Sequence, residues 1–86
     1  MKKRFKGRIL VVDDERSMRE MLEIFLGREG FEVTSCPSVA EALAALGGVG
    51  SYDLVITDIN MPGQTGLDLL REMRDGSMDV PVIMIT

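Results

Sequence analysis

Three short apolar runs, each ending on a polar side chain, constrain the fold of this chain more than any other feature of its sequence. They cover residues 9–13, 53–58 and 82–86, and Val and Ile are their commonest residues. Continuous apolar runs of this length predict strands that are buried on both faces of a sheet. The polar residues that close the runs need a separate explanation, because a charge costs free energy in a protein interior.

A first helix is expected after the first of these strands, because apolar residues recur there on one helical stripe. The stripe consists of Met18, Met21, Leu22, Phe25 and Leu26. Ser17 and Glu20 have the spacing of a capping box, and Gly30 is suited to the end of the helix. Residues 31–35 then alternate between polar and apolar side chains, so we expect a second strand near an edge of the sheet.

Two further helices are expected from the same kinds of signal. Ser38 and Glu41 have capping-box spacing, and Thr65 precedes Asp68 in the same way. The side chains expected to face the interior are Val39, Leu43 and Leu46 in one helix, and Leu67, Leu70 and Met73 in the other. Pro81 stands at the start of the last strand, where its missing N–H does least harm.

The alternation of strands and helices predicts an α/β fold with a parallel sheet covered on both faces and joined by right-handed crossovers. In such a sheet all the strands end on the same side, which is where ligands bind in open α/β folds. Asp13, Asp14, Asp58 and Thr86 close three of the strands. The fold would therefore bring these four side chains together.

The distribution of charge limits the partners of this chain. Its net charge is −4, but five of its ten basic residues lie in the first eight positions, so residues 9–86 carry a net charge of −9. We interpret residues 1–7 as a basic lead-in and residues 8–86 as the folded domain. An acidic domain repels the phosphate backbone, so direct nucleic-acid binding by this segment is not expected.

The chain also lacks signals for secretion or for a membrane. The apolar run after the basic start covers only residues 9–12, whereas a secretory core needs roughly 7–15 apolar residues and a membrane span about 20. A single cysteine, Cys36, allows no disulfide within the chain, which suits a reducing compartment. We therefore expect a cytoplasmic location and no membrane partner.

Three carboxylates brought together in this way repel one another. Two unit charges about 5 Å apart cost about 3 kcal/mol at an effective dielectric constant of about 20. A small divalent cation such as Mg²⁺ would offset this repulsion and leave coordination positions for phosphate oxygens. Asp58, alone on its strand, could both ligate the ion and attack phosphorus as a nucleophile, and the hydroxyl of Thr86 could donate a hydrogen bond to a phosphoryl oxygen. A single Asp at a strand end is more often an ordinary turn residue, but the coincidence at three strand ends favours a site.

The segments ILVVDDE, DLVITDINMPGQTGLDLL and VPVIMIT together resemble the receiver domain of bacterial two-component response regulators, over residues 8–86. This resemblance implies a doubly wound, flavodoxin-like parallel sheet. It also implies a role in a phosphorelay, in which a sensor histidine kinase phosphorylates the receiver with the help of Mg²⁺. The segment around the third strand is similar to receivers of transcriptional regulators, so the implied output is transcriptional.

The resemblance also implies roles for individual residues. Asp58 matches the phosphoacceptor, and Thr86 matches the switch hydroxyl that moves to meet the phosphate. Pro62 and Gly66 match the loop that shapes the site.

The implied metal site uses the acidic pair. Asp13 and Asp14 match the residues that hold Mg²⁺, Asp14 directly, and Asp58 contributes an oxygen. Asn60 matches the position whose main-chain carbonyl completes the metal site and whose side chain tunes dephosphorylation.

The sequence departs from the family pattern at its end. That pattern continues beyond the Thr with a helix, a fifth strand ending in a Lys, and a last helix, whereas this sequence stops at Thr86. We therefore expect residues 1–86 alone not to be competent for phosphoryl transfer, and any output domain to lie outside this chain. An exposed apolar strand at residues 82–85 would also favour self-association with another copy.

Two other functions remain open from the sequence. A Mg²⁺-dependent phosphatase working through an aspartyl-phosphate, of the haloacid-dehalogenase type, needs a second Asp two residues after the nucleophile, and Asn60 stands there. A receiver-shaped interaction domain that never takes phosphate is the other alternative. The leading interpretation, a phosphoacceptor domain, turns over no external substrate and catalyses only its own modification.

Overall fold

A computed structural model describes residues 5–85, which form an α/β fold in which parallel strands alternate with helices. The elements are β1 (Arg8–Val12), α1 (Arg16–Arg28), β2 (Glu32–Cys36), α2 (Val39–Leu46), β3 (Leu54–Asp58), α3 (Gly66–Asp75) and β4 (Val82–Ile85). The strand order is β2-β1-β3-β4, and every neighbouring pair is parallel. The predicted doubly wound topology is confirmed, since its strand order changes direction at β1.

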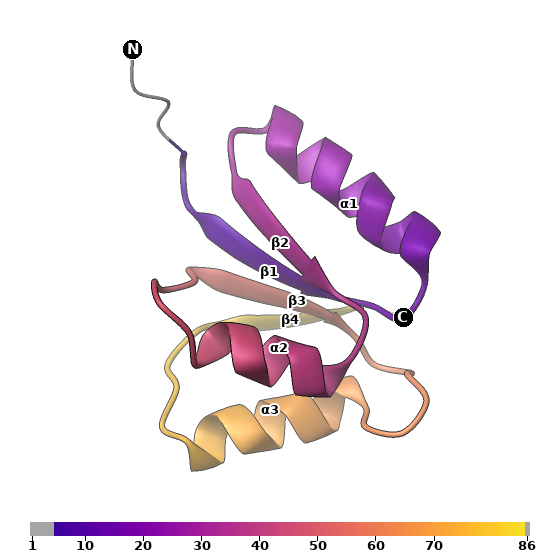
Figure 1. Ribbon diagram of the computed structural model, residues 1–86, viewed down its shortest axis with the longest axis vertical. Coiled ribbons are helices and arrows are strands. Elements are labelled where there is room, and N and C mark those ends of the chain that lie inside the picture. The colour runs from indigo at the N-terminus through magenta and orange to yellow at the C-terminus, as the bar shows by residue number, and fades with distance from the viewer. Residues whose placement is uncertain (1–4, 86) are drawn as a thin grey trace.

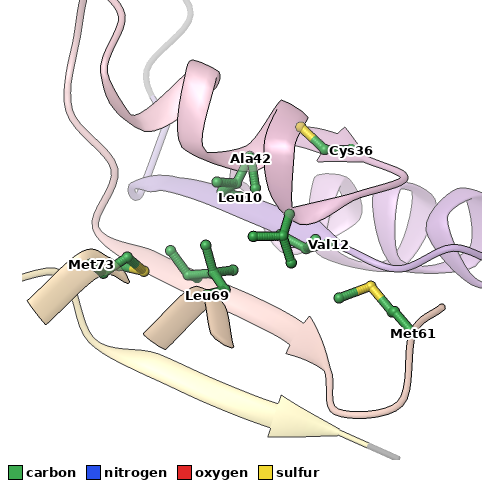
Figure 2. Packing of buried hydrophobic residues seen from close by; sticks show 9 residues of the cluster. Leu10, Val12, Cys36, Ala42, Met61, Leu69 and Met73 are labelled. Atoms are coloured by element: carbon green, nitrogen blue, oxygen red, sulfur yellow. The ribbon is translucent and has the colours of Figure 1, made fainter. Parts of the chain in front are cut away.

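The helices cover the two faces of the sheet unequally. Figure 1 shows α1 on one face and both α2 and α3 on the other, with all strand arrows pointing the same way. The main hydrophobic core lies between α2, α3 and the sheet, as Figure 2 shows for Leu10 and Val12 of β1 beside Leu69 of α3. β1 is buried along most of its length, as its apolar run predicts.

The start of α1 differs from the prediction. Ser17 does not cap this helix, because α1 begins earlier, at Arg16, with Glu15 as a cap that accepts no side-chain hydrogen bond. A carboxylate oxygen of Asp13 accepts a hydrogen bond from the Glu15 N–H at 2.9 Å, so the chain turns directly after β1. Glu20, the other half of the expected capping box, instead pairs with Arg16. The end of α1 is as expected: Gly30 has a positive φ of 98° and follows the C-cap.

The other helix caps agree with the sequence. Ser38 accepts a hydrogen bond from the N–H of Glu41 at the start of α2. Thr65 and Asp68 form a complete capping box at the start of α3.

The buried face of α3 was predicted incorrectly at one position. Leu67 is 54% exposed, whereas Leu69 is fully buried and Met73 nearly so. Gly66, Leu69 and Met73 form the buried stripe, so the helix is rotated about its axis from the predicted orientation. The rotation follows from the close packing of Gly66 on β3, described below.

The proposed basic lead-in remains a prediction. Residues 1–4 lie outside the described residues. Next to β1, the Lys6 N–H donates to the Gly30 carbonyl at 2.8 Å, and the Glu32 N–H donates to the Gly7 carbonyl at 2.9 Å. Residues 5–85 contain no helix that is both long and apolar enough to span a membrane.

Candidate functional site

The site is built by two neighbouring strands in the middle of the sheet. β1 pairs with β3 in a register that places Val12 opposite Thr57, so the residues that follow these positions end the two strands side by side. One carboxylate oxygen from each of Asp13, Asp14 and Asp58 lies within 4.8 Å of the others. The predicted meeting of the three carboxylates is thus observed.

Asp13 is the most firmly held of the three acidic residues. The residue is only 3% exposed. Its N–H donates to the Cys36 carbonyl at 3.1 Å, which extends the pairing of β1 with β2 by one residue. Its own carbonyl accepts a hydrogen bond from Nη1 of Arg19 at 2.8 Å. With the bond from Glu15, these contacts hold both the main chain and the carboxylate of Asp13 in place.

Asp58 and Asp14 are more accessible than Asp13. Asp58 is half-buried, and its Oδ1 accepts a hydrogen bond from the N–H of Asn60 at 3.1 Å. Asp14 and Asn60 are exposed. The ion pairs found within residues 5–85 do not include any of the three clustered carboxylates. The carboxylates therefore meet at an open position where a ligand can reach them.

The loop after β3 is held close to Asp58 by Gly66. The Gly66 N–H donates to the Ile59 carbonyl at 3.1 Å. A Cβ at position 66 would lie 2.5 Å from the Asp58 carbonyl oxygen and 3.2 Å from Cγ2 of Thr57. Only glycine fits here without displacing the main chain of Asp58. Pro62, the other loop residue predicted from the resemblance, is exposed, and Met61 before it is 7% exposed and joins the core.

Thr86 lies outside the described residues. The strand before it does end beside Asp58: Ile85 is opposite Asp58 in the register of β3 with β4, and its carbonyl accepts a hydrogen bond from the Ile59 N–H at 2.9 Å.

Two contributors to the site were missed by the sequence analysis. Met61 anchors the loop in the core, although a single apolar residue within a turn gives no periodic signal. Arg19 bonds the Asp13 carbonyl, although an arginine in the first turns of a helix would ordinarily be assigned to solvent. For Cys36, whose carbonyl accepts the hydrogen bond from Asp13, burial and then the charge of Glu41 raise the pKa and disfavour the thiolate.

The donor atoms at this site fit a hard divalent cation. All three side chains offer carboxylate oxygens, the ligands that Mg²⁺ prefers, and two of them are accessible to solvent. A dication would also offset the mutual repulsion of three close negative charges. The residues present are therefore suited to binding Mg²⁺.

Comparison with known proteins places this site in a family. The sequence profile of the response regulator receiver domain matches residues 9–86. The chain belongs to this receiver domain family. The acidic cluster thus lies in a phosphoacceptor signalling domain of the two-component type.

Relatives of this receiver domain include transcriptional regulators. The uncharacterized transcriptional regulatory protein YkoG of Bacillus subtilis is 40% identical over 81 residues, which cover 94% of this chain and 35% of YkoG. The chain spans about a third of the length of the curated relatives that it matches.

Solved receiver structures share the fold closely. The response regulator TrrA of Thermotoga maritima, in complex with Mg²⁺-BeF, is 45% identical, with a TM-score of 0.82, and the match covers 90% of this chain and 66% of that one. TrrA has also been crystallised with the histidine kinase ThkA; that match has 46% identity and a TM-score of 0.83, and covers 92% of this chain and 67% of TrrA.

Proposed function

We propose that Asp58 accepts a phosphoryl group from a sensor histidine kinase in a Mg²⁺-dependent reaction, and that the phosphorylated domain switches a transcriptional output. The observation that carries this proposal is the meeting of Asp13, Asp14 and Asp58 within 4.8 Å where β1 and β3 end. The complexes of TrrA with Mg²⁺-BeF and with a histidine kinase support the choice of metal and of partner.

Each residue has a defined part in the proposed reaction. An oxygen of Asp58 attacks phosphorus, the bond from phosphorus to the kinase histidine breaks, and an acyl phosphate forms while the imidazole leaves. Asp13, Asp14, Asp58 and the main-chain carbonyl of Asn60 would hold Mg²⁺, which neutralises charge on the transferred group. The hydroxyl of Thr86 would donate a hydrogen bond to the bound phosphoryl group.

The arrangement around Asp58 suits this role. The hydrogen bond from Asn60 holds Oδ1 at 3.1 Å, so the orientation of the carboxylate is set before the donor arrives. Gly66 holds the main chain of Asp58 against the start of α3. Preorganisation of this kind lowers the cost of reaching the reactive geometry.

The test is phosphorylation by a small donor. Acetyl phosphate with Mg²⁺ should add one acid-stable, base-labile phosphoryl group, detected by intact mass, and Asp58→Asn should abolish it. The match to TrrA covers 66% of that chain, so the yield is measured on a full-length receiver that includes these residues, and on residues 1–86 beside it. An adduct that survives Asp58→Asn would show that Asp58 is not the nucleophile. The absence of an adduct on the full-length receiver would favour an interaction domain that takes no phosphate.

The wider cellular role forms part of the same proposal. The domain would respond to a histidine kinase and act through an output domain or protein, without contacting nucleic acid itself, since residues 9–86 are strongly acidic. A cytoplasmic location is consistent with a chain whose one cysteine is a free, buried thiol. Phosphorylation and dephosphorylation of Asp58 would be the only chemistry of the domain.

We also propose that residues 1–86 self-associate through β4. This strand lies at one edge of the sheet, and Ile83 on it is 50% exposed, so its free main-chain groups can pair with a second copy. Ile83→Lys should reduce association in sedimentation velocity experiments, whereas Leu67→Lys, at a similarly exposed leucine on α3, should not. A chain that stays monomeric and unfolds cooperatively at all concentrations would contradict this proposal.

A further inference from the structure

Two arginines lie close together at the start of α1 and have different environments. Arg16 is 84% exposed at its side chain and pairs with Glu20, four residues further along the helix, at 3.0 Å. Arg19 is half-buried, and its Nη1 donates to the main-chain carbonyl of Asp13 at 2.8 Å. Burying part of a guanidinium costs solvation free energy, and a charge-assisted hydrogen bond in a partly buried position compensates for it. Arg19 thus makes a charge-assisted hydrogen bond to the main chain of the acidic site.

This bond completes a set of three contacts around one residue. The N–H of Asp13 is held by the Cys36 carbonyl of β2, and its carboxylate by the N–H of Glu15. The carbonyl is held from the helix side, by Arg19. Without Arg19, the peptide group between Asp13 and Asp14 would lose its hydrogen bond to α1. The two carboxylates that flank this peptide could then turn away from Asp58.

We propose that Arg19 is a positioning residue of the acidic site, which holds the Asp13–Asp14 peptide so that both carboxylates face the Mg²⁺ position. This inference rests on the proposed Mg²⁺ site. It concerns the geometry of the ligands, since Arg19 bonds a carbonyl and makes no ion pair with the cluster within residues 5–85.

A purely electrostatic role for Arg19 predicts the opposite effect of its removal on Mg²⁺ affinity. A positive charge near three carboxylates repels a dication, so its removal would strengthen Mg²⁺ binding. A positioning role requires the reverse, because removal of the hydrogen bond loosens the ligands. Residues that orient a metal ligand typically contribute about 10- to 100-fold to metal affinity. We expect the lower end of this range, since Arg19 bonds the main chain and not the carboxylate itself.

The experiment compares Mg²⁺ affinity, by isothermal titration calorimetry, among the full 86-residue chain and three variants. Arg19→Met keeps the length of the side chain but removes the donors, and should weaken Mg²⁺ binding about tenfold. Arg19→Lys retains a donor and should restore most of the affinity. Arg16→Met removes an equivalent charge from the same helix and should leave the affinity unchanged. Thermal melting by circular dichroism reports the folded fraction of each variant.

A second measurement needs no metal. In ¹H–¹⁵N spectra of the metal-free chain, Arg19→Met should shift the amide resonances of Asp14 and Glu15 and speed their hydrogen exchange, whereas Arg16→Met should not. If the unsubstituted chain binds no Mg²⁺, the proposed metal site fails, and the amide spectra still test Arg19. Tighter Mg²⁺ binding by Arg19→Met, equal effects of Arg16→Met and Arg19→Met, or unchanged Asp14 and Glu15 amides would overturn the positioning role. Should Arg19→Met not fold, a folded Arg19→Lys variant with Mg²⁺ affinity reduced tenfold or more would overturn it as well.

Discussion

The two ends of the parallel sheet both carry charged residues. At one end opposite charges are paired, and at the other end like charges are clustered. At the amino end, where the strands begin, Arg8 pairs with Glu32 at 3.3 Å, stacks over the ring of Tyr52 at 4.6 Å, and donates through its main-chain N–H to Asp53 at 2.8 Å. At the carboxyl end, where the strands finish, three carboxylates meet, and none of the ion pairs within residues 5–85 includes one of them.

The charged residues at the amino end therefore have a structural role, whereas those at the carboxyl end are suited to binding a ligand. Opposite charges at the amino end satisfy one another, so that end contributes to stability and has little to offer a ligand. Like charges at the carboxyl end raise the free energy of the ligand-free protein, and a cation can recover that free energy on binding. A cluster of like charge at an accessible position is therefore a candidate binding site for a cation.

The largest expected difference between the two ends appears when one Asp at each is changed to Asn. Asp14→Asn should weaken Mg²⁺ binding by about 10- to 100-fold and raise the free energy of unfolding without metal, because it removes a like charge from the cluster. Asp53→Asn should leave Mg²⁺ affinity unchanged and lower the free energy of unfolding, because it weakens the bond to Arg8. Calorimetric titration and urea unfolding measure both quantities, and a stability change of the same sign in both variants would contradict the comparison.

A smaller difference is expected for glycines at the two ends. Gly66→Ala should destabilise the fold by about 2 kcal/mol, because its Cβ would meet the Asp58 main-chain oxygen at 2.5 Å. Gly7→Ala is the matched control: its Cβ would meet Oδ2 of Asp53 at 3.0 Å. This side-chain atom can move aside at the cost of its hydrogen bond from the Arg8 N–H, so we expect a change of about 1 kcal/mol or less. Urea unfolding measures both. Equal destabilisation would mean that the main chain near Asp58 is not closely packed.

The smallest expected effect is on the pH dependence of stability. It involves Asp68, whose carboxylate accepts its hydrogen bonds at the start of its own helix, α3. The hydrogen bond from the Thr65 N–H, at 2.8 Å, lowers the pKa of Asp68 below its ordinary value, with help from the Thr65 hydroxyl and Arg71. Because the pKa is lower in the folded state, the cap stabilises the protein above the ordinary pKa of aspartate, and this contribution is lost as the pH falls through the lowered pKa. Melting temperatures measured across this acidic range should depend less on pH in Asp68→Asn than in the unsubstituted chain. Asp75→Asn, at the other end of α3, is the control, and an equal change in both variants would argue against the cap.

The sequence analysis succeeded where the signals are local. The boundaries of the strands were correct to within about one residue, and the caps Ser38 and Thr65 were both identified, since each depends on residues a few positions apart. It failed at Ser17 and at Leu67. In the first case the Asp13 side chain turns the chain sooner than the capping pattern suggests, and in the second the packing of Gly66 on β3 sets the rotation of α3.

The candidate site was likewise predicted only in part. From the sequence alone, Asp13, Asp14 and Asp58 could be placed together, because parallel strands must all end on one side of their sheet. The contact of Arg19 with the Asp13 carbonyl and the close approach of Gly66 to Asp58 were visible only in the tertiary structure. The periodicity of side chains determines which elements form, since it depends on neighbours along the chain. The orientation of each helix, and therefore what surrounds the carboxylates, depends on how all the elements pack against one another at once.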